Sequence, residues 1–291
     1  MTLNYRIRTL AATIAVAGTL SCHQADKAPR SLPSASQQQT QRQIGETLWL
    51  TGNGLRLKSE IFRSRKLNDH PVLVVVLHGD SPFHNPSYQY LFASRAAKQV
   101  DDVVVAAILR PGYADDTNER SQGERGLTTG DNYTSQNVDA IAEAIDQLKT
   151  RFHPAETLLV GHSGGAAITG DILGRHPSEV DAALLVSCPC VLDKWRQHML
   201  TLQKNAIWQQ PVSSLSPLDL ARKVPKSTKV WLVVGSNDDV APPELTQEYA
   251  KALREHGNEA QVTVTPALPH DILLEPVTME KLKELVEAMK K

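Results

Sequence analysis

Apolar runs alternate with amphipathic stretches along most of the chain, from about residue 46 to the end. The main apolar runs cover residues 71–79, 101–109, 157–161, 180–187 and 229–235. Unbroken runs of aliphatic and β-branched residues are typical of strands that are covered on both faces. These runs therefore predict the central strands of a buried sheet.

Helical periodicity fills the intervals between the runs. Residues 137–152 place Val138, Ile141 and Ile145 on one stripe. Residues 242–257 begin with prolines suited to a first helical turn and end on Gly257. Further helix-like stretches cover 88–100, 165–176 and 279–291, and further strand-like stretches cover 46–50, 55–62 and 260–266. This alternation predicts an α/β protein with a doubly wound, mostly parallel sheet.

The first 45 residues lack this alternation. Residues 1–21 carry Arg6 and Arg8 ahead of an apolar run that is too short to span a membrane, which indicates an export signal peptide. Residues 22–45 are rich in Gln, Ser and Pro, and we expect them to form a disordered tether. The predicted globular domain is therefore 46–291.

Cys22 follows the sequence Thr-Leu-Ser and resembles the lipid-attachment cysteine of bacterial lipoproteins. Thr19 and Leu20 depart from the pattern preferred at that site. Two alternatives are open: a periplasmic domain anchored to the membrane through a lipid on Cys22, or a soluble exported protein released by cleavage near Ser21.

Composition and charge narrow the possible partners. The chain has 291 residues, of which 41% are hydrophobic, with 31 basic and 32 acidic side chains. A formal charge of −1 without a long basic run gives no reason to expect a nucleic-acid partner. We therefore set nucleic-acid binding aside and expect membrane contact only through a lipid anchor.

One serine lies between glycines where a predicted strand meets a predicted helix. Residues 161–165, Gly-His-Ser-Gly-Gly, match the pattern G-x-S-x-G in the strand-turn-helix context that this motif requires. Glycines permit the sharp turn, and Ser163 then lies at a helix N-terminus, where the backbone N–H of Gly164 points outward. The motif indicates a nucleophilic serine. A turn with a capping serine, or a phosphate-binding turn, is the alternative.

A serine hydroxyl needs a base and an orienting acid to become a nucleophile, and candidates for both follow later strands. Asp238 follows one predicted strand and His270 follows the next. The order Ser163, Asp238, His270 is the one expected when each residue leaves the carboxyl edge of a single parallel sheet. Asp239 is the alternative acid.

These segments together resemble the α/β-hydrolase fold over nearly all of 46–291. The resemblance rests on the serine motif and on LHGD (77–80), RPGY (110–113), GSNDDVAP (235–242) and LPHDILL (268–274), which occur in family order. It implies a serine hydrolase with the catalytic residues Ser163, Asp238 and His270. It also implies an oxyanion hole formed by the backbone N–H groups of Gly164 and Asp80.

Asp80 departs from the glycine-rich oxyanion loops of many lipases, and Ser81 is the alternative donor. A carboxylate near a developing negative charge is unfavourable unless it turns away or meets a cationic group of the substrate. Tyrosines accompany acidic residues in the loops expected around the serine. They bind an amine through their ring faces, or they pack the loops. The candidate substrate-binding tyrosines are Tyr88, Tyr113 and Tyr133.

Residues from about 189 to 226 lie between two predicted strands, and in this fold such an insertion implies a short helical cap. Trp195 lines the substrate pocket or packs inside the cap. Cys188 and Cys190 are separated by one proline. We expect two buried thiols, because a disulfide over so short a span is strained, with a labile redox pair as the alternative. No metal-ligand spacing occurs, so we expect neither a metal nor a cofactor.

The resemblance implies acyl transfer through a covalent intermediate on Ser163, with a small carboxylic ester as the expected substrate. Cleavage of an aminoacyl amide, as in the proline-specific exopeptidases of this fold, is the first alternative. A non-catalytic binding protein that retains the fold is the second.

Overall fold

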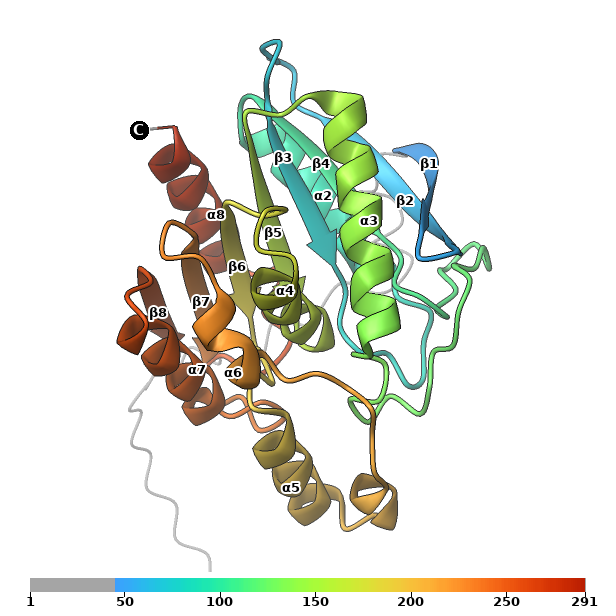
Figure 1. The fold of residues 1–291 in the computed structure, drawn as a ribbon, viewed down its shortest axis with the longest axis vertical. Coiled ribbons are helices and arrows are strands. Elements are labelled where there is room, and N and C mark those ends of the chain that lie inside the picture. The colour runs from blue at the N-terminus through green and yellow to red at the C-terminus, as the bar shows by residue number, and fades with distance from the viewer. Residues whose placement is uncertain (1–44, 291) are drawn as a thin grey trace, which may run out of the picture.

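The computed structural model describes residues 45–290, which form one sheet covered by helices on both faces (Figure 1). The predicted signal peptide (1–21), Cys22 and the predicted tether up to residue 44 lie outside the described residues. No helix of the described part is long and apolar enough to cross a membrane.

The eight strands of residues 45–290 are ordered β1-β2-β4-β3-β5-β6-β7-β8. Their bounds are β1 (Glu46–Gly52), β2 (Leu55–Arg63), β3 (Val72–Leu77), β4 (Val103–Ile108), β5 (Glu156–His162), β6 (Ala182–Val186), β7 (Lys229–Gly235) and β8 (Ala260–Thr265). The strand β2 pairs antiparallel with β1 and with β4, and all other neighbours pair parallel. The predicted α/β class with a doubly wound, mostly parallel sheet is confirmed.

Helices follow most of the parallel strands. They are α2 (Tyr88–Gln99), α3 (Ser135–Phe152), α4 (Gly164–Arg175), α5 (Leu192–Gln203), α6 (Pro217–Leu220), α7 (Pro243–Glu255) and α8 (Pro276–Met289), with the 3₁₀ turns η1 (Ala206–Gln209) and η2 (Ala221–Lys223). Apolar residues of α3, α4 and α7 pack on one face of the sheet, and those of α2 and α8 pack on the other. Figure 1 shows these two layers.

The apolar runs of the sequence become strands because both faces of the sheet are covered. In β3, Leu73 and Val75 belong to the core under α3 and α4, whereas Val74 and Val76 belong to the core under α2 and α8. Side chains alternate between faces along a strand, so a strand buried on both sides has no place for a polar residue. The same reasoning applies to β4, whose residues are all buried.

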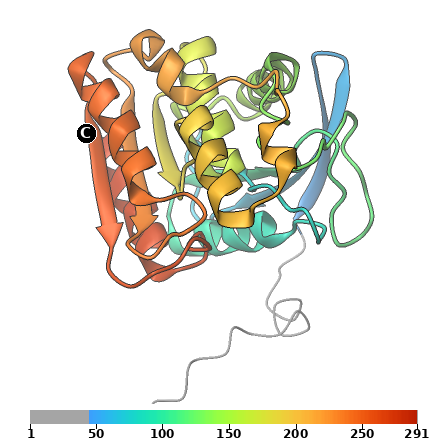
Figure 2. The same ribbon diagram turned by 90° about the horizontal axis from the view of Figure 1, so that it is seen from below.

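The carboxyl ends of the parallel strands meet at one edge of the sheet, and the candidate residues lie there. Ser163 follows β5, Asp238 follows β7 and His270 follows β8. Ligand sites of open parallel sheets lie outside this edge, because the loops that leave it gather there. In Figure 1 this is the lower edge, toward which β3 points, and Figure 2 views the molecule from that side.

The segment between β6 and β7 holds α5, η1, α6 and η2. The helix α6 and the turn η2 pack against α4, while α5 packs against η1. Trp195 and Trp208 meet edge to face with ring centroids 5.2 Å apart, and both are buried. The indole N–H of Trp195 donates to the carbonyl of Val240. Trp195 is therefore a packed residue that joins this segment to the loop after β7.

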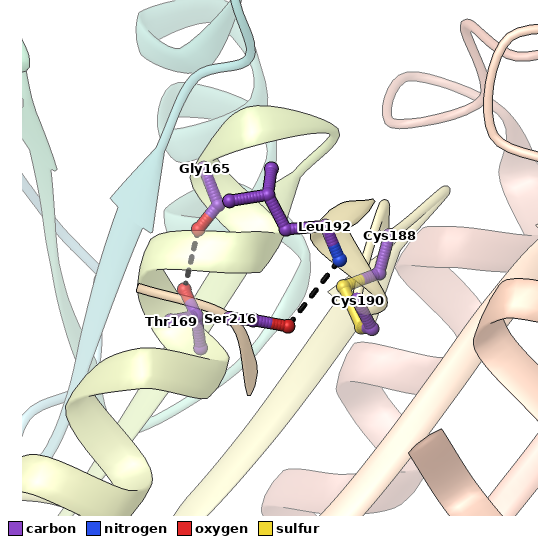
Figure 3. Close-up of a disulfide and its surroundings, with 6 residues drawn as sticks. All are labelled: Gly165, Thr169, Cys188, Cys190, Leu192 and Ser216. Atoms are coloured by element: carbon purple, nitrogen blue, oxygen red, sulfur yellow. Dashed lines mark hydrogen bonds between the residues drawn. A yellow bond between two sulfur atoms is a disulfide. The ribbon is translucent and has the colours of Figure 1, made fainter. Parts of the chain in front are cut away.

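Cys188 and Cys190 form a disulfide, so the expectation of two free thiols is wrong (Figure 3). Both residues are fully buried at the end of β6. Their Cα atoms are 5.1 Å apart, which is within the range that a disulfide bridges, because the chain turns at the proline between them. The turn is held from both sides, since Ser187 N–H donates to Val233 and Leu218 N–H donates to the carbonyl of Cys190.

Asp171 is a buried residue of α4. Neither of its carboxylate oxygens has a hydrogen-bond partner among the described residues. The hydroxyl groups of Tyr249 and Thr246 likewise lack partners there. Burial, with a smaller contribution from the negative charge of Asp219, raises the pKa of Asp171 well above 3.8. Unfolding exposes the carboxyl to water, where it ionises at its ordinary pKa.

We expect Asp171→Asn to stabilise the protein, and increasingly so as the pH rises. A raised pKa in the folded state means that the native protein holds a proton that the unfolded chain releases, so wild-type stability falls as pH rises from the ordinary pKa toward the raised one. The asparagine variant lacks this titration, and its gain reaches about 1–3 kcal/mol at alkaline pH. Urea unfolding at several pH values measures it.

The matched control for this prediction is Asp69→Asn, which removes an exposed carboxylate that does not act on the pKa of Asp171. Its expected change in the free energy of unfolding is within about 0.5 kcal/mol. Equal or lower stability of Asp171→Asn at alkaline pH would contradict the prediction.

Candidate active site

The turn between β5 and α4 holds Ser163 in a strained backbone conformation. Its φ is 52° and its ψ is −122°, which L-residues with a side chain rarely adopt. Three hydrogen bonds hold the turn: Ser163 N–H donates to Val186 at 2.9 Å, and the Ser163 carbonyl accepts from Ala166 at 2.8 Å and Ala167 at 3.1 Å. The strain is therefore offset by β6 on one side and by the first turn of α4 on the other.

Two glycines of the motif allow the helix to approach the sheet this closely. A Cβ atom on Gly161 would collide with the backbone of α4 at Gly165 and Ala166. A Cβ atom on Gly165 would collide with the backbone carbonyls of Leu77 and His78, at the end of β3. The pattern G-x-S-x-G is thus a steric requirement of the place where β3, β5 and α4 meet.

The structure brings together the three residues of the predicted triad. His270 Nε2 lies 2.9 Å from Ser163 Oγ, across 107 residues of sequence. His270 Nδ1 lies 2.9 Å from each carboxylate oxygen of Asp238. Since the carboxylate only accepts, the proton of the ring lies on Nδ1, and Nε2 is left to accept from the serine hydroxyl. This is the geometry in which an imidazole can act as a base toward Ser163.

The alternative acid, Asp239, is not part of this arrangement. Asp238 is 4% exposed, and its Oδ1 also accepts the N–H groups of Val240 at 3.1 Å and Ala241 at 2.7 Å. Asp239 is exposed, and it is the backbone carbonyl of Asp239 that accepts from the ring of His198. The acid loop therefore presents one carboxylate to the histidine and the other to the surface.

Neighbouring hydroxyl and imidazole groups hold the loop that carries His270. The His270 carbonyl accepts the hydroxyl of Ser187 at 2.7 Å and the N–H of Ile272 at 2.9 Å. His162 Nε2 lies 3.3 Å from the same carbonyl. The position of the base is thus set by the last residue of β5 and the first residue after β6 as well as by its own loop.

His162 joins three segments of the site. The backbone N–H of Gly79 donates to the hydroxyl oxygen of Tyr88 at 2.5 Å, and that hydroxyl lies 2.8 Å from His162 Nδ1. The tyrosine proton therefore goes to Nδ1, and Nε2–H of His162 donates to His270. Burial, followed by the nearby His270, lowers the pKa of His162 from 6.5 to about 4, so the ring is neutral at physiological pH.

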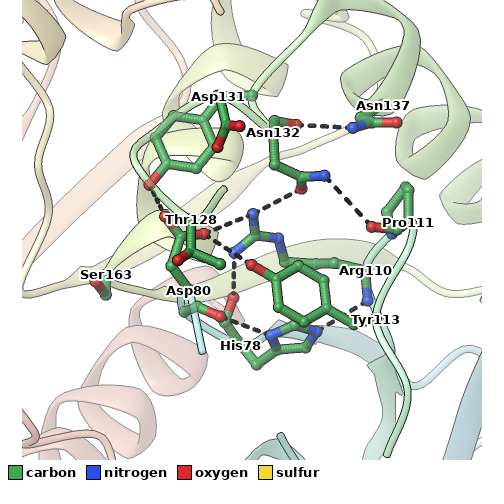
Figure 4. A network of polar contacts seen from close by, with 12 residues as sticks. His78, Asp80, Arg110, Pro111, Tyr113, Thr128, Asp131, Asn132, Asn137 and Ser163 are labelled. Atoms are coloured by element: carbon green, nitrogen blue, oxygen red, sulfur yellow. Dashed lines mark hydrogen bonds and ion pairs between the residues drawn. The ribbon is translucent and has the colours of Figure 1, made fainter. Parts of the chain in front are cut away.

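The predicted oxyanion donors come from neighbouring segments. The carboxylate of Asp80 and the hydroxyl of Tyr133 lie directly over Gly164, because a Cβ atom there would be 2.7 Å from Asp80 Oδ1 and 2.5 Å from Tyr133 Oη. Figure 4 shows Asp80 between Ser163 and Arg110. The loop after β3 therefore lies across the start of α4, where the backbone N–H groups of Asp80 and Gly164 belong to facing segments.

The candidate substrate-binding side chains are engaged with the protein itself. Tyr113 and Tyr133 are 1% and 0% exposed, and their hydroxyls donate to the carboxylate of Asp80 at 3.2 Å and 2.8 Å. Tyr88 is partly buried and bonded to Gly79 and His162. These contacts tie the tyrosines to the loop that carries Gly79 and Asp80 and to His162. A substrate role for them stays a prediction.

Sequence reasoning assigned no role to Arg110, although the residue belongs to a motif noted above. Arg110 is fully buried and pairs with Asp80 at 3.0 Å. The available signal was a charged residue directly after the buried strand β4, where a cation needs a partner. Ser187 was also missed, and here the sequence offers no signal, because nothing in it relates Ser187 to His270.

One group of potential metal ligands occurs within residues 45–290, formed by His162, His270 and Asp271. Both histidines already take part in the hydrogen bonds described above. The expectation of a metal-free and cofactor-free site stays a prediction.

Comparisons with known proteins agree with this architecture. The model of the alpha/beta hydrolase family matches residues 74–218, which run from β3 to α6. No curated protein sequence matches significantly.

Solved structures that resemble the chain include Est1E, an esterase and an acylaminoacyl peptidase. Est1E from Butyrivibrio proteoclasticus, solved with ferulic acid, has a TM-score of 0.66 at 15% identity and covers 84% of this chain and 100% of its own. An esterase of Pyrococcus furiosus has a TM-score of 0.62 at 18% identity and covers 89% of this chain and 98% of its own. The acylaminoacyl peptidase of Pyrococcus horikoshii has a TM-score of 0.64 at 14% identity, and the match covers 86% of this chain and 42% of the peptidase.

These likenesses, the family match and the strand order together define the fold. The protein has the α/β-hydrolase fold, as the sequence predicts. At these identities the structural likeness shows the fold, and the chemistry of the site rests on the residues of this chain.

We expect His162→Gln to weaken the pH dependence of the free energy of unfolding in the acid range. Because the pKa of His162 is about 4 in the folded protein against 6.5 ordinarily, the unfolded chain binds more protons, and wild-type stability falls as pH decreases between these values. Over this pH range the free energy of unfolding should fall by about 2–3 kcal/mol less in the variant than in the wild type. Denaturant unfolding at closely spaced pH values gives both slopes.

His70→Gln serves as the control, because His70 is exposed in the loop before β3. Burial also lowers the pKa of His78, with a smaller contribution from His162, and His78 is present in all three proteins. A His162→Gln slope equal to that of the wild type would contradict the neutral, buried ring described here.

Proposed function

We propose that the protein is a serine hydrolase that cleaves a carboxylic ester through an acyl-enzyme on Ser163. The observation that carries this proposal is the chain of contacts from Ser163 Oγ through His270 to Asp238, each about 2.9 Å long. Such a chain, at the carboxyl edge of the sheet and at the start of a helix, suits activation of a hydroxyl nucleophile.

In the proposed first half-reaction, His270 Nε2 removes the hydroxyl proton as Ser163 Oγ attacks the ester carbonyl carbon. The backbone N–H groups of Gly164 and Asp80 stabilise the negative oxygen of the tetrahedral intermediate. His270 then donates the proton to the alcohol oxygen, the carbon–oxygen bond breaks, and the acyl group stays on Ser163. Asp238 stabilises the imidazolium that exists between these two proton transfers.

Water completes the reaction in the second half. His270 removes a proton from water, the resulting hydroxide attacks the acyl carbon, and the same N–H groups hold the oxyanion again. Collapse of the intermediate returns the proton to Ser163 and releases the carboxylic acid.

The charges around the site favour an ester over a substrate with a free amine. Two acids of the overhanging loops already pair with cations, Asp80 with Arg110 and Asp115 with Lys58, whereas Asp131 accepts the neutral N–H groups of Leu127 and Thr129. A paired carboxylate binds a further cation weakly, because its charge is already compensated. The likeness to Est1E, solved with ferulic acid, and to an esterase of Pyrococcus furiosus supports the same choice.

Hydrolysis of an aminoacyl amide is the second candidate. The likeness to an acylaminoacyl peptidase favours it, since the attack on an amide uses the same serine, base and oxyanion donors.

A fluorophosphonate probe tests the nucleophile directly. We expect a covalent adduct on Ser163, located by mass spectrometry of the digested protein, and none on Ser163→Ala. His270→Ala should slow labelling by about 10³-fold or more, because the hydroxyl loses its base. Ser178→Ala, which removes an exposed hydroxyl, is the control and should label like the wild type. A folded wild-type protein that gives no adduct would support a binding protein instead.

A substrate panel separates the two hydrolytic candidates. We expect p-nitrophenyl esters of short acids to be cleaved with a kcat/KM at least about 10²-fold above that for aminoacyl p-nitroanilides, and Ser163→Ala to lower ester kcat by about 10⁴-fold. Faster cleavage of anilides with a free amino group than of the esters would favour the amide hydrolase.

A further inference from the structure

A negative side chain lies beside the place where the proposed reaction generates negative charge. Asp80 Oδ1 is close to Gly164, whose backbone N–H is one of the two proposed oxyanion donors. The other donor is the backbone N–H of Asp80 itself. An uncompensated carboxylate at this distance would raise the energy of the oxyanion, because like charges repel strongly in a site with little water.

Arg110 supplies the compensating charge from the opposite side of the loop. Its Nη2 lies 3.0 Å from Asp80 Oδ1, and the guanidinium is fully buried. An arginine stays protonated in proteins, so the pair is neutral as a whole. Among residues 45–290, Arg110 is the one cationic side chain that contacts this carboxylate.

The same arginine also holds the backbone of the oxyanion loop. Arg110 Nη1 donates to the His78 carbonyl at 3.1 Å, and the Arg110 backbone N–H donates to His78 Nε2 at 3.0 Å. Nη2 also donates to Asn132 Oδ1 at 2.8 Å, which fixes the plane of the guanidinium (Figure 4). Arg110 therefore bonds the loop at His78 and at Asp80, on both sides of Gly79.

The tyrosines around Asp80 cannot replace this charge. Tyr113 and Tyr133 donate hydroxyl protons to the carboxylate, but they are neutral. Burial, followed by the charge of Asp80, raises the pKa of both hydroxyls, so both remain protonated donors. They orient the carboxylate, and only Arg110 cancels its charge.

We propose that Arg110 is a positioning residue of the oxyanion hole, which aims the Asp80 backbone N–H at the reaction centre and neutralises the Asp80 carboxylate beside it. The inference rests on the proposed function and adds to it a residue outside the triad. It assigns to Asp80 two opposed effects, a useful backbone N–H and a harmful side-chain charge that the arginine removes.

A pair of substitutions tests the charge compensation. We expect Arg110→Gln to lower kcat for a p-nitrophenyl ester by about 10²–10³-fold with KM changed less than about threefold, because the effect falls on the transition state. Adding Asp80→Asn should then return kcat to within about tenfold of the wild type, a gain of at least about tenfold, since the backbone N–H remains and the uncompensated charge is gone. A purely structural arginine gives no such recovery.

Two further variants serve as matched comparisons. Arg110→Lys keeps the positive charge and should retain more activity than Arg110→Gln. Arg196→Gln removes another buried guanidinium, which bonds the carbonyls of Thr129, Trp208 and Gln210, and Asp80→Asn should not improve its kcat. Recovery of less than about twofold in the Arg110→Gln background, or equal recovery with Arg196→Gln, would overturn the proposal.

The double variant decides the question even where Arg110→Gln alone does not fold. With both charges removed, kcat should lie within about tenfold of the wild type, and a fall of about 10²-fold or more in a folded double variant would refute the charge argument. Labelling of wild-type Ser163 by the fluorophosphonate is measured in the same series. Labelling without recovery refutes only the role of Arg110, whereas absence of both labelling and ester turnover in the wild type refutes the proposed function as well.

Discussion

The strained turn at Ser163 is the constraint on which the rest of the site depends. A φ of 52° in a residue with a side chain is unfavourable, and it persists because β6 bonds the Ser163 N–H while α4 bonds its carbonyl. The turn also requires glycine on both sides, where β3, β5 and α4 approach within contact distance. In this junction the hydroxyl of Ser163 points toward the loops that leave the carboxyl edge of the sheet, where it contacts His270.

Those loops bring two carboxylates near the serine, and each one meets a different partner. Asp238 faces the imidazole of His270, which gains a proton during the proposed reaction, so its charge is useful at that moment. Asp80 faces Arg110, whose charge is permanent, so the pair is neutral throughout. The two acids therefore differ in their proposed roles because each one faces a different partner, as pairs of titratable groups in active sites commonly do.

The hydrogen bonds of His162 and Ser187 show how separate loops become one rigid site. His162 joins Gly79, through Tyr88, to the carbonyl of His270, and Ser187 holds the same carbonyl from the end of β6. The bonds from Tyr88 to His162, from His162 to His270 and from Ser187 to His270 link residues 74, 108 and 83 positions apart, so they do not contribute to local structure. Preorganised donors and bases need this support, because a hydrogen bond displaced by about 1 Å loses much of its catalytic effect.

The strands, the helices and the order of the candidate triad could be predicted from the sequence, because buried strands, amphipathic helices and the glycine motif follow local rules of packing and backbone sterics. It did not determine how the side chains outside the candidate triad pair. The disulfide of Cys188 and Cys190 depends on how the chain turns after β6, and the burial of Tyr113 and Tyr133 depends on where Asp80 lies. The pairing of Arg110 with Asp80 needs β3 and β4 side by side. Contacts between loops arise only when the sheet has assembled, since their energies depend on distances that no local pattern encodes.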